Sequence, residues 1–481
     1  YATRWVTTQK TQFQRLGIRG DWDHPYLTMA PAFESKIVET FLGLCKQGYV
    51  YRGLKPVLWD PANETALANT EAEHKDHISP SIHVAFPLLA GGDPNGVLNA
   101  TPGVRVLIWT TTPWTIPANT GLSVHPDFDY VVVGTSNHGP LLVADGLLAD
   151  VTSSCALENV TELLRLRGSD LVGIRFQHPL HALDPIFDRE SPICSANYVT
   201  LDTGTGIVHT APGHGPDDYI TGMKHGLRVL SPVDGRGRFT EDAGPFVGIS
   251  TDEGNKVIPQ ALTDAGALLA LRDFSHKYPH APRAPYKPLI FRATVQWFVA
   301  VDHNDLRKKA LAGIDTVAWY PPQASNRISA AVAGRPDWTV SRQRHWGVPI
   351  AIFYANGEPV FDETAYDAAV AVIRENGIEA WYSMSPVDIL PDGFTYNGIP
   401  ASEFTKEKDV LDVWFDSGST SFAVLDSGVW PDHSWPADLY LEGSDQHRGW
   451  FNSSLMIATA MRGVPPYRAV VTNGFTVDEL G

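Results

Sequence analysis

PADLYLEGSDQHRGWFNSSLMIATAMRGVPPYRAVVTNGF, at residues 436–475, carries three structural signals in succession. PADLYLEGSDQ predicts a strand that runs into a polar loop, RGWFNSSLMIATAMRG predicts a helix that ends at Gly463, and YRAVVTNGF predicts the next strand. A strand, a helix and a strand at this spacing indicate a parallel sheet with a right-handed crossover. Ligands of such sheets bind at the carboxyl ends of the strands. The segment therefore predicts an α/β fold with a ligand site near the polar loop.

The loop itself is unusually polar. Five polar side chains at one strand–loop–helix junction are costly to bury and are not explained by packing alone, so they favour a site for a polar small molecule. They are Glu442, Asp445, Gln446, His447 and Arg448. A second segment, DVWFDSGSTS at residues 412–421, places an aromatic pair beside an acid and a glycine-containing turn. That segment is equally typical of a buried strand with a capped turn.

The composition changes in the middle of the chain. From about Val84 to Pro259, short β-rich runs such as VRVLIWT, DYVVVGT, GPLLVAD and TGIVHTA alternate with turn residues, which predicts a compact, mostly β module. Upstream, FESKIVETFLGLCKQG predicts a helix that Gly48 ends. No repeat or low-complexity tract is visible. The pattern predicts an α/β sheet whose two halves are separated by a β-rich insertion.

Three threonines in a row, Thr110 to Thr112, follow an apolar run in VLIWTTTPWTIPANTGLSVHP. β-Branched side chains suit a strand, but hydroxyls at a strand end also suit a polar pocket. GTGIVHTAPGHGPDDY, at residues 204–219, combines four glycines with two histidines and two aspartates. Glycines allow the backbone to approach a ligand closely. Asp217 and Asp218 stand at the expected start of a helix, where only one aspartate is needed as a cap, so the other is free to face a cation. His209, His214 and Asp218 also suggest a metal site, although the spacing fits no common zinc pattern.

Composition bounds the class of protein. The chain has 481 residues, which suggests about three domains or one large insertion, and its 43% hydrophobic and 19% charged residues are ordinary for a globular protein. No apolar run approaches the ~20 residues that span a bilayer, and the start has no signal-peptide core. Three scattered cysteines indicate a reducing compartment, so a cytoplasmic or organellar location is expected. The first residue, Tyr1, suggests an internal piece of a longer protein.

The net charge of −17 argues, taken alone, against binding of nucleic acid. Positive charge is nevertheless concentrated in two segments. HKYPHAPRAPYKPLIFR, at residues 276–292, holds two lysines and two arginines without an acid, and SRQRHWG, at residues 341–347, adds two arginines. Each is as consistent with an ordinary solvated face as with a basic binding surface.

Five motifs together resemble isoleucyl-tRNA synthetases, a family of class I aminoacyl-tRNA synthetases. WTTTPWTIPAN, HTAPGHGPDDY, RPDWTVSRQRHWGVPI, DVWFDSGST and YLEGSDQHRGWF occur in the family's order, and the match covers essentially the whole chain. Valyl and leucyl relatives typically carry a Thr-Thr-Arg-Pro version of the threonine motif and lack the Glu-Gly-Ser-Asp-Gln-His loop; a valyl-type relative is the neighbouring alternative.

The resemblance implies a Rossmann-type catalytic domain that is split by a β-rich editing insertion. The expected boundaries are 1–55 and 336–481 for the two catalytic parts, 56–83 and 260–335 for connecting segments, and 84–259 for the editing domain. The family's ATP-handling signatures, His-Ile-Gly-His and Lys-Met-Ser-Lys-Ser, are absent from the sequence. They are expected upstream of Tyr1 and just beyond Gly481, so editing rather than synthesis is expected of this chain.

The partners that the resemblance implies are isoleucine, its tRNA, and ATP with Mg²⁺ in the full-length enzyme. A monomer without membrane association is expected. Many relatives carry cysteines, some of them zinc ligands, in segments that match LWDPANETALANTEAEH and HKYPHAPRAPYKP. Neither segment contains a cysteine here, so no zinc is expected.

For synthesis, the resemblance assigns six residues. The isoleucine side chain would lie between two tryptophans, a glutamine would help to hold the ammonium group, and the adenylate would contact a loop whose acid is a good acceptor for ribose hydroxyls. The isoleucine residues are Trp414, Trp450 and Gln446, and the adenylate residues are Glu442, Gly443 and Asp445.

For editing, the resemblance assigns seven residues. A pocket cannot exclude valine, which is smaller than isoleucine by one methylene, and the lost burial is worth only ~1–3 kcal/mol, a limit for which this enzyme family is itself the usual example. A second pocket would therefore hydrolyse the wrong ester. Its hydroxyls would hold the terminal adenosine and the water, an aspartate would pair with the α-ammonium, and a histidine would exclude isoleucine. The residues are Thr110, Thr111, Thr112, Trp114, Asn119, His209 and Asp218.

No Ser–His–Asp or Cys–His arrangement is visible in the sequence, so water is the expected nucleophile. Three other readings stay open from the sequence. They are a metal-dependent hydrolase that uses His209, His214 and Asp218, a carbohydrate-active enzyme with many tryptophans, and a tRNA-binding piece without catalytic activity.

Overall fold

The computed structural model describes residues 1–68 and 71–479. The chain divides into two compact units, one formed by residues 1–51 together with 298–481 and the other by residues 52–297. The second unit is thus a continuous segment that interrupts the first in sequence. No helix in the described ranges is both long and apolar enough to cross a membrane.

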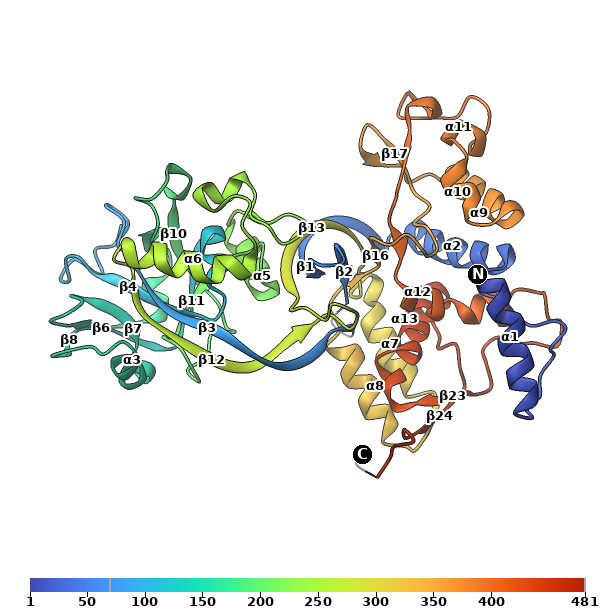
Figure 1. Cartoon of the computed structure of the whole chain (residues 1–481), viewed down its shortest axis with the longest axis horizontal. Coiled ribbons are helices and arrows are strands. Elements are labelled where there is room, and N and C mark those ends of the chain that lie inside the picture. The colour runs from blue at the N-terminus through green and yellow to red at the C-terminus, as the bar shows by residue number, and fades with distance from the viewer. Residues whose placement is uncertain (69–70, 480–481) are drawn as a thin grey trace. The chain divides into compact units, whose positions relative to one another are not determined.

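The first unit combines helices with short strands (Figure 1). Its helices are α1 (Ala2–Arg15), α2 (Pro31–Lys46), α7 (Leu306–Ile314), α8 (Ala324–Ala333), α9 (Glu363–Asn376), α10 (Glu379–Ser383), α11 (Pro386–Ile389), α12 (Val413–Gly418) and α13 (Trp450–Arg462). Its strands are β14 (Ala318–Tyr320), β15 (Trp338–Thr339), β16 (Ser341–Arg342), β17 (Phe353–Ala355), β18 (Glu358–Pro359), β19 (Thr395–Tyr396), β20 (Ile399–Pro400), β21 (Thr405–Lys406), β22 (Val410–Leu411), β23 (Tyr440–Gly443) and β24 (Ala469–Asn473).

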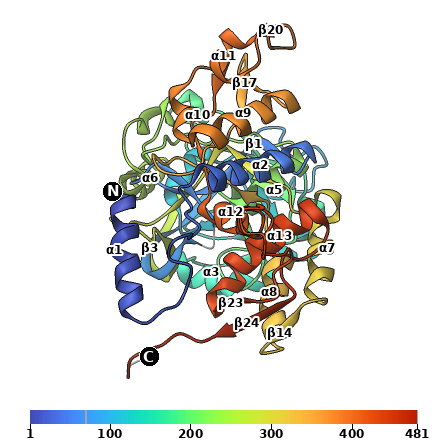
Figure 2. The same cartoon turned by 90° about the vertical axis from the view of Figure 1, so that its right-hand side faces the viewer.

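The predicted strand, helix and parallel strand near the carboxyl end of the chain are confirmed as β23, α13 and β24. The two strands are parallel, with Tyr440 opposite Val470. The helix ends at Gly463, whose φ of +75° favours glycine because other residues are strained there. Figure 2 shows these strands below α12 and α13, which pack against each other.

The parallel sheet has three strands, in the order β14-β24-β23. Within the described part of residues 1–51, the chain supplies helices α1 and α2 but no strand to this sheet. The helix predicted upstream is confirmed as α2, whose Ile37, Phe41 and Leu44 are buried at helical spacing. The fold is therefore α/β, with a parallel sheet that draws its strands from residues 318–473.

The second unit is mostly β. Its strands are β2 (Thr65–Leu67), β3 (Glu73–Pro87), β4 (Arg105–Thr110), β5 (Gly121–Val124), β6 (Asp129–Gly134), β7 (Leu141–Ala144), β8 (Thr161–Arg167), β9 (Arg175–Gln177), β10 (Glu190–Ser195), β11 (Ile207–Thr210) and β12 (Leu268–His280). Its helices are α3 (Leu148–Ser154), α4 (Gly168–Leu171), α5 (Pro216–His225) and α6 (Thr251–Asp264). Strands β1 (Val50–Asp60) and β13 (Ile290–Val299) carry the chain into and out of this unit.

Ten strands form one mixed sheet, with β8-β6-β7-β4-β11-β5-β10-β9 in order and the β3/β12 pair attached through β4. The four β-rich runs singled out in the sequence correspond to β4, β6, β7 and β11. Apolar residues of β4, β6 and β7 are buried with α3 in one cluster, and burial of this kind contributes about 25 cal/mol per Å² of apolar surface. The cluster comprises Ala85, Leu107, Val131, Val133, Leu141, Val143, Leu147, Val151, Cys155 and Leu157.

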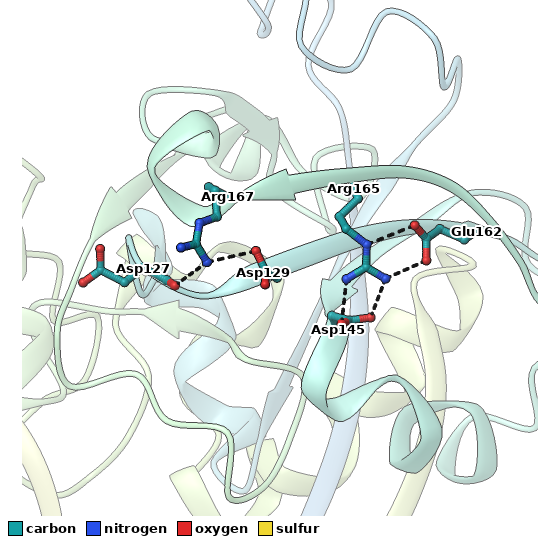
Figure 3. Close-up of polar contacts among 6 residues, drawn as sticks. All are labelled: Asp127, Asp129, Asp145, Glu162, Arg165 and Arg167. Carbon is teal, nitrogen blue, oxygen red and sulfur yellow. Dashed lines mark hydrogen bonds and ion pairs between the residues drawn. The ribbon is translucent and has the colours of Figure 1, made fainter.

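The edge strand β8 is covered with ion pairs (Figure 3). Arg165 lies between Asp145 and Glu162, with shortest N···O distances of 2.7 and 2.8 Å, and Arg167 contacts Asp129 at 3.0 Å. Exposed pairs contribute little stability, about 0–1 kcal/mol each. A charged edge instead discourages pairing with the strand of another molecule.

Candidate functional site

A pocket of about 210 Å³ lies in the second unit, where the threonine segment leaves β4. Thr111, Thr112 and Trp114 line it. The rest of its wall comes from the β3/β12 pair, from the start of α6, from the turn after β1, from the turn at Arg236 and from residues 287–290. These other residues include His77, Ser79, Tyr278, Ser250, Thr251, Asp252, Asn255, Arg236 and Lys287.

The backbone of the threonine segment is held in a tight turn. The Thr112 amide donates to Thr110 Oγ1 at 3.0 Å, and Thr115 Oγ1 donates to the Thr112 carbonyl at 2.8 Å. The Trp114 amide donates to Asn255 Oδ1 at 3.3 Å. The hydroxyl of Thr110 therefore supports the turn, whereas Thr111 and Thr112 present side chains to the pocket.

His209 is buried beneath this turn and does not line the pocket. Because the hydroxyl of Thr115 already donates to Thr112, it accepts from His209 Nε2 at 2.9 Å. His209 Nδ1 then accepts from Asn119 Nδ2 at 2.8 Å. Burial lowers the pKa of His209 to about 3, so the ring is neutral at physiological pH, in agreement with these hydrogen-bond roles.

Asn119 is also buried, behind His209. Its amide nitrogen donates to the Gly121 carbonyl at 2.8 Å, and its Oδ1 accepts from Ser191 Oγ at 2.6 Å. Every polar atom of the Asn119 side chain thus has a partner. The geometry makes Asn119 and His209 supports of the pocket turn rather than parts of its surface.

Asp218 lies in the first turn of α5, as the sequence predicts for a helix start. Its Oδ2 accepts from the Ala211 amide at 2.9 Å and its Oδ1 from the Tyr198 hydroxyl at 3.2 Å. Burial raises the pKa of Asp218 to about 6, although these two hydrogen bonds oppose the rise. The Asp218 side chain is half-buried and does not line the pocket, and a carboxylate with a raised pKa is a candidate functional group.

The two predicted editing motifs meet where two neighbouring strands of the sheet end. Strands β4 and β11 are parallel neighbours, with Val208 opposite Trp109. The carboxyl ends of these strands therefore lie side by side, at Thr110 and Thr210. The threonine turn follows β4, and the segment that follows β11 begins with Ala211, whose amide donates to Asp218.

Several wall residues of the pocket had no signal in the sequence. His77 and Tyr278 lie on β3 and β12, about 200 positions apart, and only the pairing of these strands brings them together. The rings of His77 and Tyr278 lie 5.1 Å apart. Burial raises the pKa of Tyr278 to about 12, so its hydroxyl stays protonated. Because the two strands are so far apart in the sequence, no motif indicates that His77 and Tyr278 are neighbours.

The metal reading of His209, His214 and Asp218 finds no support. Both ring nitrogens of His209 have hydrogen-bond partners, and His214 Nδ1 donates to the Phe291 carbonyl at 2.8 Å. Across residues 1–68 and 71–479, no group of three or more His, Cys, Asp or Glu side chains is arranged to hold a metal ion. Residues 69 and 70, inside the cysteine-free segment 58–74, lie outside the described residues.

The residues expected to serve synthesis gather in the first unit, at the carboxyl end of β23. Glu442 and Gly443 end this strand, Asp445 and Gln446 follow in a short 3₁₀ turn, and Trp450 begins α13. Gln446 Nε2 donates to Asp445 Oδ2 at 2.8 Å. Gln446 Oε1 accepts from the Trp450 amide at 2.8 Å.

The Trp414 ring packs against Gly449, the residue that precedes Trp450. A Cβ atom at Gly449 would lie 2.7 Å from the Trp414 ring and 2.6 Å from Gln446 Oε1, so only glycine fits there. The Trp450 ring stacks on Tyr440 at 3.9 Å between centroids, and its Nε1 donates to the Ser417 carbonyl at 2.9 Å. The structure therefore brings both tryptophans and Gln446 together.

Asp412 fixes the start of α12, and the sequence did not identify this role. Its Oδ1 accepts from the Trp414 amide at 3.1 Å, and its Oδ2 from Trp338 Nε1 at 2.9 Å. The same Oδ2 pairs with the guanidinium of Arg342 at 3.0 Å, and both charged side chains are at most 5% exposed. Trp338 and Arg342 belong to RPDWTVSRQRHWGVPI, which joins this motif to DVWFDSGST.

Comparison with known proteins places these motifs in a family context. The model of a family described as tRNA synthetases class I (I, L, M and V) matches residues 1–481. An isoleucine–tRNA ligase of Carboxydothermus hydrogenoformans is 48% identical over 100% of this chain and 51% of its own length. The isoleucine–tRNA ligase of Bacillus subtilis is 46% identical over 100% of this chain and 50% of its own length. The chain thus spans about half the length of the curated relatives it matches.

Proposed function

The chain belongs to the class I tRNA synthetases of the I, L, M and V group, and from this premise we propose that it is part of an isoleucine–tRNA ligase and carries its editing activity. The proposed reaction is hydrolysis of valine from mischarged isoleucine tRNA. The observation that carries the proposal is the meeting of the threonine turn and the Asp218 segment at the carboxyl ends of β4 and β11, beside a polar pocket.

In the proposed reaction, water attacks the ester carbonyl and the tRNA leaves through its ribose oxygen. Thr111 and Thr112 offer hydroxyls that hydrogen-bond the terminal adenosine or orient the water. Asp218, ionised above about pH 6, pairs with the α-ammonium group and so aligns the ester. His209 acts through Thr115, because its ring holds the hydroxyl that fixes the Thr112 carbonyl.

Selectivity is proposed to come from the shape of this pocket. Isoleucine carries one more methylene than valine, and overpacking a rigid wall costs about 1–3 kcal/mol. The wall is rigid because the turn, His209 and Asn119 form a closed set of hydrogen bonds. Trp114 adds an aromatic side to the pocket.

We assign synthesis to the first unit in the complete enzyme. Trp414 and Trp450 would enclose the isoleucine side chain, Gln446 would hold its ammonium group, and the end of β23 with Asp445 would hold the adenylate. ATP with Mg²⁺ would be the co-substrate. Since the sequence contains neither His-Ile-Gly-His nor Lys-Met-Ser-Lys-Ser, the activity proposed for this chain alone is editing.

A deacylation assay without ATP tests the proposal. Purified chain at high concentration, mixed with isoleucine tRNA that carries radiolabelled valine, is expected to release valine faster than buffer does, and to release isoleucine from correctly charged tRNA more slowly. Binding of both tRNAs without hydrolysis of either would instead favour the non-catalytic tRNA-binding reading.

A further inference from the structure

Asn255 links helix α6 to the threonine turn of the pocket. It lies near the start of this helix and lines the pocket together with Trp114. Its Oδ1 accepts from the Trp114 amide at 3.3 Å. Because a backbone amide can only donate, this contact assigns the oxygen of the Asn255 side chain to Trp114. The Nδ2 group is then the end of the side chain that does not face Trp114.

This Nδ2 group is a donor without a protein acceptor. Among residues 1–68 and 71–479, Asn255 Nδ2 has no hydrogen-bond partner. It is not enclosed in the interior either, where an unsatisfied donor would be costly. Because Asn255 lines the pocket, the donor is available to a ligand that enters there.

Packing fixes the position of Asn255. A Cβ atom at the preceding residue, Gly254, would lie 2.7 Å from the Phe239 ring and 3.4 Å from Trp114 Cβ, so the glycine lets α6 approach both. The side chain of Ser250 caps the start of the same helix. Asn255 therefore presents its donor from a fixed position. Such a preorganised donor needs no reorganisation when negative charge develops beside it.

Two other donors that line the pocket are already engaged. Ser79 Oγ hydrogen-bonds to His276 Nε2 at 2.9 Å. Arg236 Nε pairs with Glu64 at 3.0 Å, and the arginine side chain is 72% exposed. The remaining hydroxyls of the wall can rotate and can either donate or accept, whereas an amide NH₂ group can only donate. Asn255 is thus a fixed donor for an oxygen that becomes negatively charged.

We propose that Asn255 Nδ2 donates a hydrogen bond to the carbonyl oxygen of the valyl ester, as a catalytic residue of the editing reaction. This inference rests on the proposed function, because it assigns a role inside the pocket in which hydrolysis is placed. As the oxygen of water bonds to the carbonyl carbon, an electron pair moves onto the carbonyl oxygen, where the donor stabilises it. The carbonyl forms again as the bond to the ribose oxygen breaks. One proton of the water ends on the ribose oxygen, and valine leaves as its carboxylate after the other proton passes to solvent.

Asn255→Asp tests the donor, because it keeps an oxygen for the Trp114 amide and removes the NH₂ group. Its rate of valyl-tRNA hydrolysis in a single turnover is expected to fall about 100- to 1000-fold, the range for loss of one such donor. The midpoint of denaturant unfolding is expected to stay unchanged, since the contact with Trp114 remains. Asn95→Asp, the same change at an exposed position of the second unit, is the matched control and is expected to keep the rate.

Binding of 3′-valylamino-3′-deoxyadenosine separates this inference from the editing proposal. The probe carries the valyl carbonyl in an amide, so its affinity does not depend on hydrolysis. Asn255→Ala is expected to weaken binding of the probe, measured by calorimetry, roughly 2- to 10-fold, the loss for one hydrogen bond. Binding of adenosine, which has no carbonyl to contact, is expected to be the same for this variant and the unchanged protein.

The two measurements have distinct outcomes. An unchanged rate for Asn255→Asp, or equal affinities of Asn255→Ala and the unchanged protein for the probe, would overturn the inference even where valyl-tRNA is hydrolysed. Equal losses of affinity for the probe and for adenosine would overturn it in favour of a structural role of Asn255. A selective loss of affinity for the probe, without hydrolysis by the unchanged protein, would support the contact with the carbonyl and contradict editing. Failure of the unchanged protein both to bind the probe and to hydrolyse valyl-tRNA would contradict both proposals.

Discussion

Asp412→Ala is expected to lower the free energy of unfolding by about 3–5 kcal/mol. The substitution leaves the Arg342 guanidinium, which is 5% exposed, without the carboxylate that it pairs with at 3.0 Å. It also removes the acceptor of Trp338 Nε1 and the cap on the Trp414 amide. The loss of the buried charge pair dominates, since a helix cap alone is worth only about 1 kcal/mol.

Denaturant unfolding followed by circular dichroism and tryptophan fluorescence measures this loss. Asp438→Ala is the matched control, because Asp438 pairs with Arg468 on the surface at 2.8 Å with both side chains more than 60% exposed. The control is expected to lose at most about 1 kcal/mol. Equal losses for the two variants would mean that the Arg342–Asp412 pair does not hold α12 in place.

Asp218→Ala is expected to lower the rate of valyl-tRNA hydrolysis about ten- to a hundredfold. A hydrogen bond to a charged group is worth roughly 1.5–3 kcal/mol, and its loss leaves the α-ammonium without a partner and the ester misaligned. Asp217→Ala is the matched control, since Asp217 is the exposed neighbour in the same helical turn. It is expected to keep the rate of the unchanged protein; equal loss in both variants, or no loss in either, would contradict the role of Asp218.

The pH dependence of hydrolysis follows from the same group. Because the pKa of Asp218 is raised to about 6, the ionised fraction falls as the pH drops below 6, and the rate of the unchanged protein is expected to fall with it. The raised pKa also means that the folded state binds this proton more tightly than the unfolded state does. The stability that the protonated form contributes is therefore present below about pH 4 and is lost as the pH rises through about 6.

Asp218→Asn consequently separates activity from folding. It removes a charge that burial disfavours, so it is expected to be at least as stable as the unchanged protein at pH 7.5. Its residual hydrolysis is expected to lose the dependence on pH near 6. A destabilised variant that keeps the pH profile would contradict both statements.

Short-range patterns allowed much of the fold to be predicted. The helix α2, the strand β23, the helix α13 and the strand β24 follow from hydrophobic periodicity and from glycines at helix ends, because these signals act within one element. The meeting of the threonine turn with His209 was available only through family resemblance. Periodicity does not reveal that β4 and β11 are neighbours, since their pairing spans about a hundred residues.

The burial and the hydrogen-bond partners of each site residue could not be predicted from the sequence. The roles given to Thr110, Asn119, His209 and Asp218 placed them at the pocket, whereas none of the four lines it in the structure, and Asn119 and His209 are buried behind it. Burial and hydrogen-bond partners depend on the side chains that other strands supply, here Thr115 and Ser191. For the same reason the support that Asp412 gives to Trp414 emerged only from the structure.

The location of hydrolysis in the pocket of the second unit is the central claim, and single-turnover hydrolysis of valyl-tRNA by a Thr111→Val and Thr112→Val double variant tests it most directly. Valine keeps the β-branched shape and removes only the two hydroxyls that the pocket presents. Thr161→Val, the same change on the exposed strand β8, is the control. The account predicts at least a tenfold lower rate for the double variant, with unchanged tRNA binding, and the rate of the unchanged protein for Thr161→Val. A double variant that binds tRNA and hydrolyses the ester as fast as the unchanged protein would contradict it.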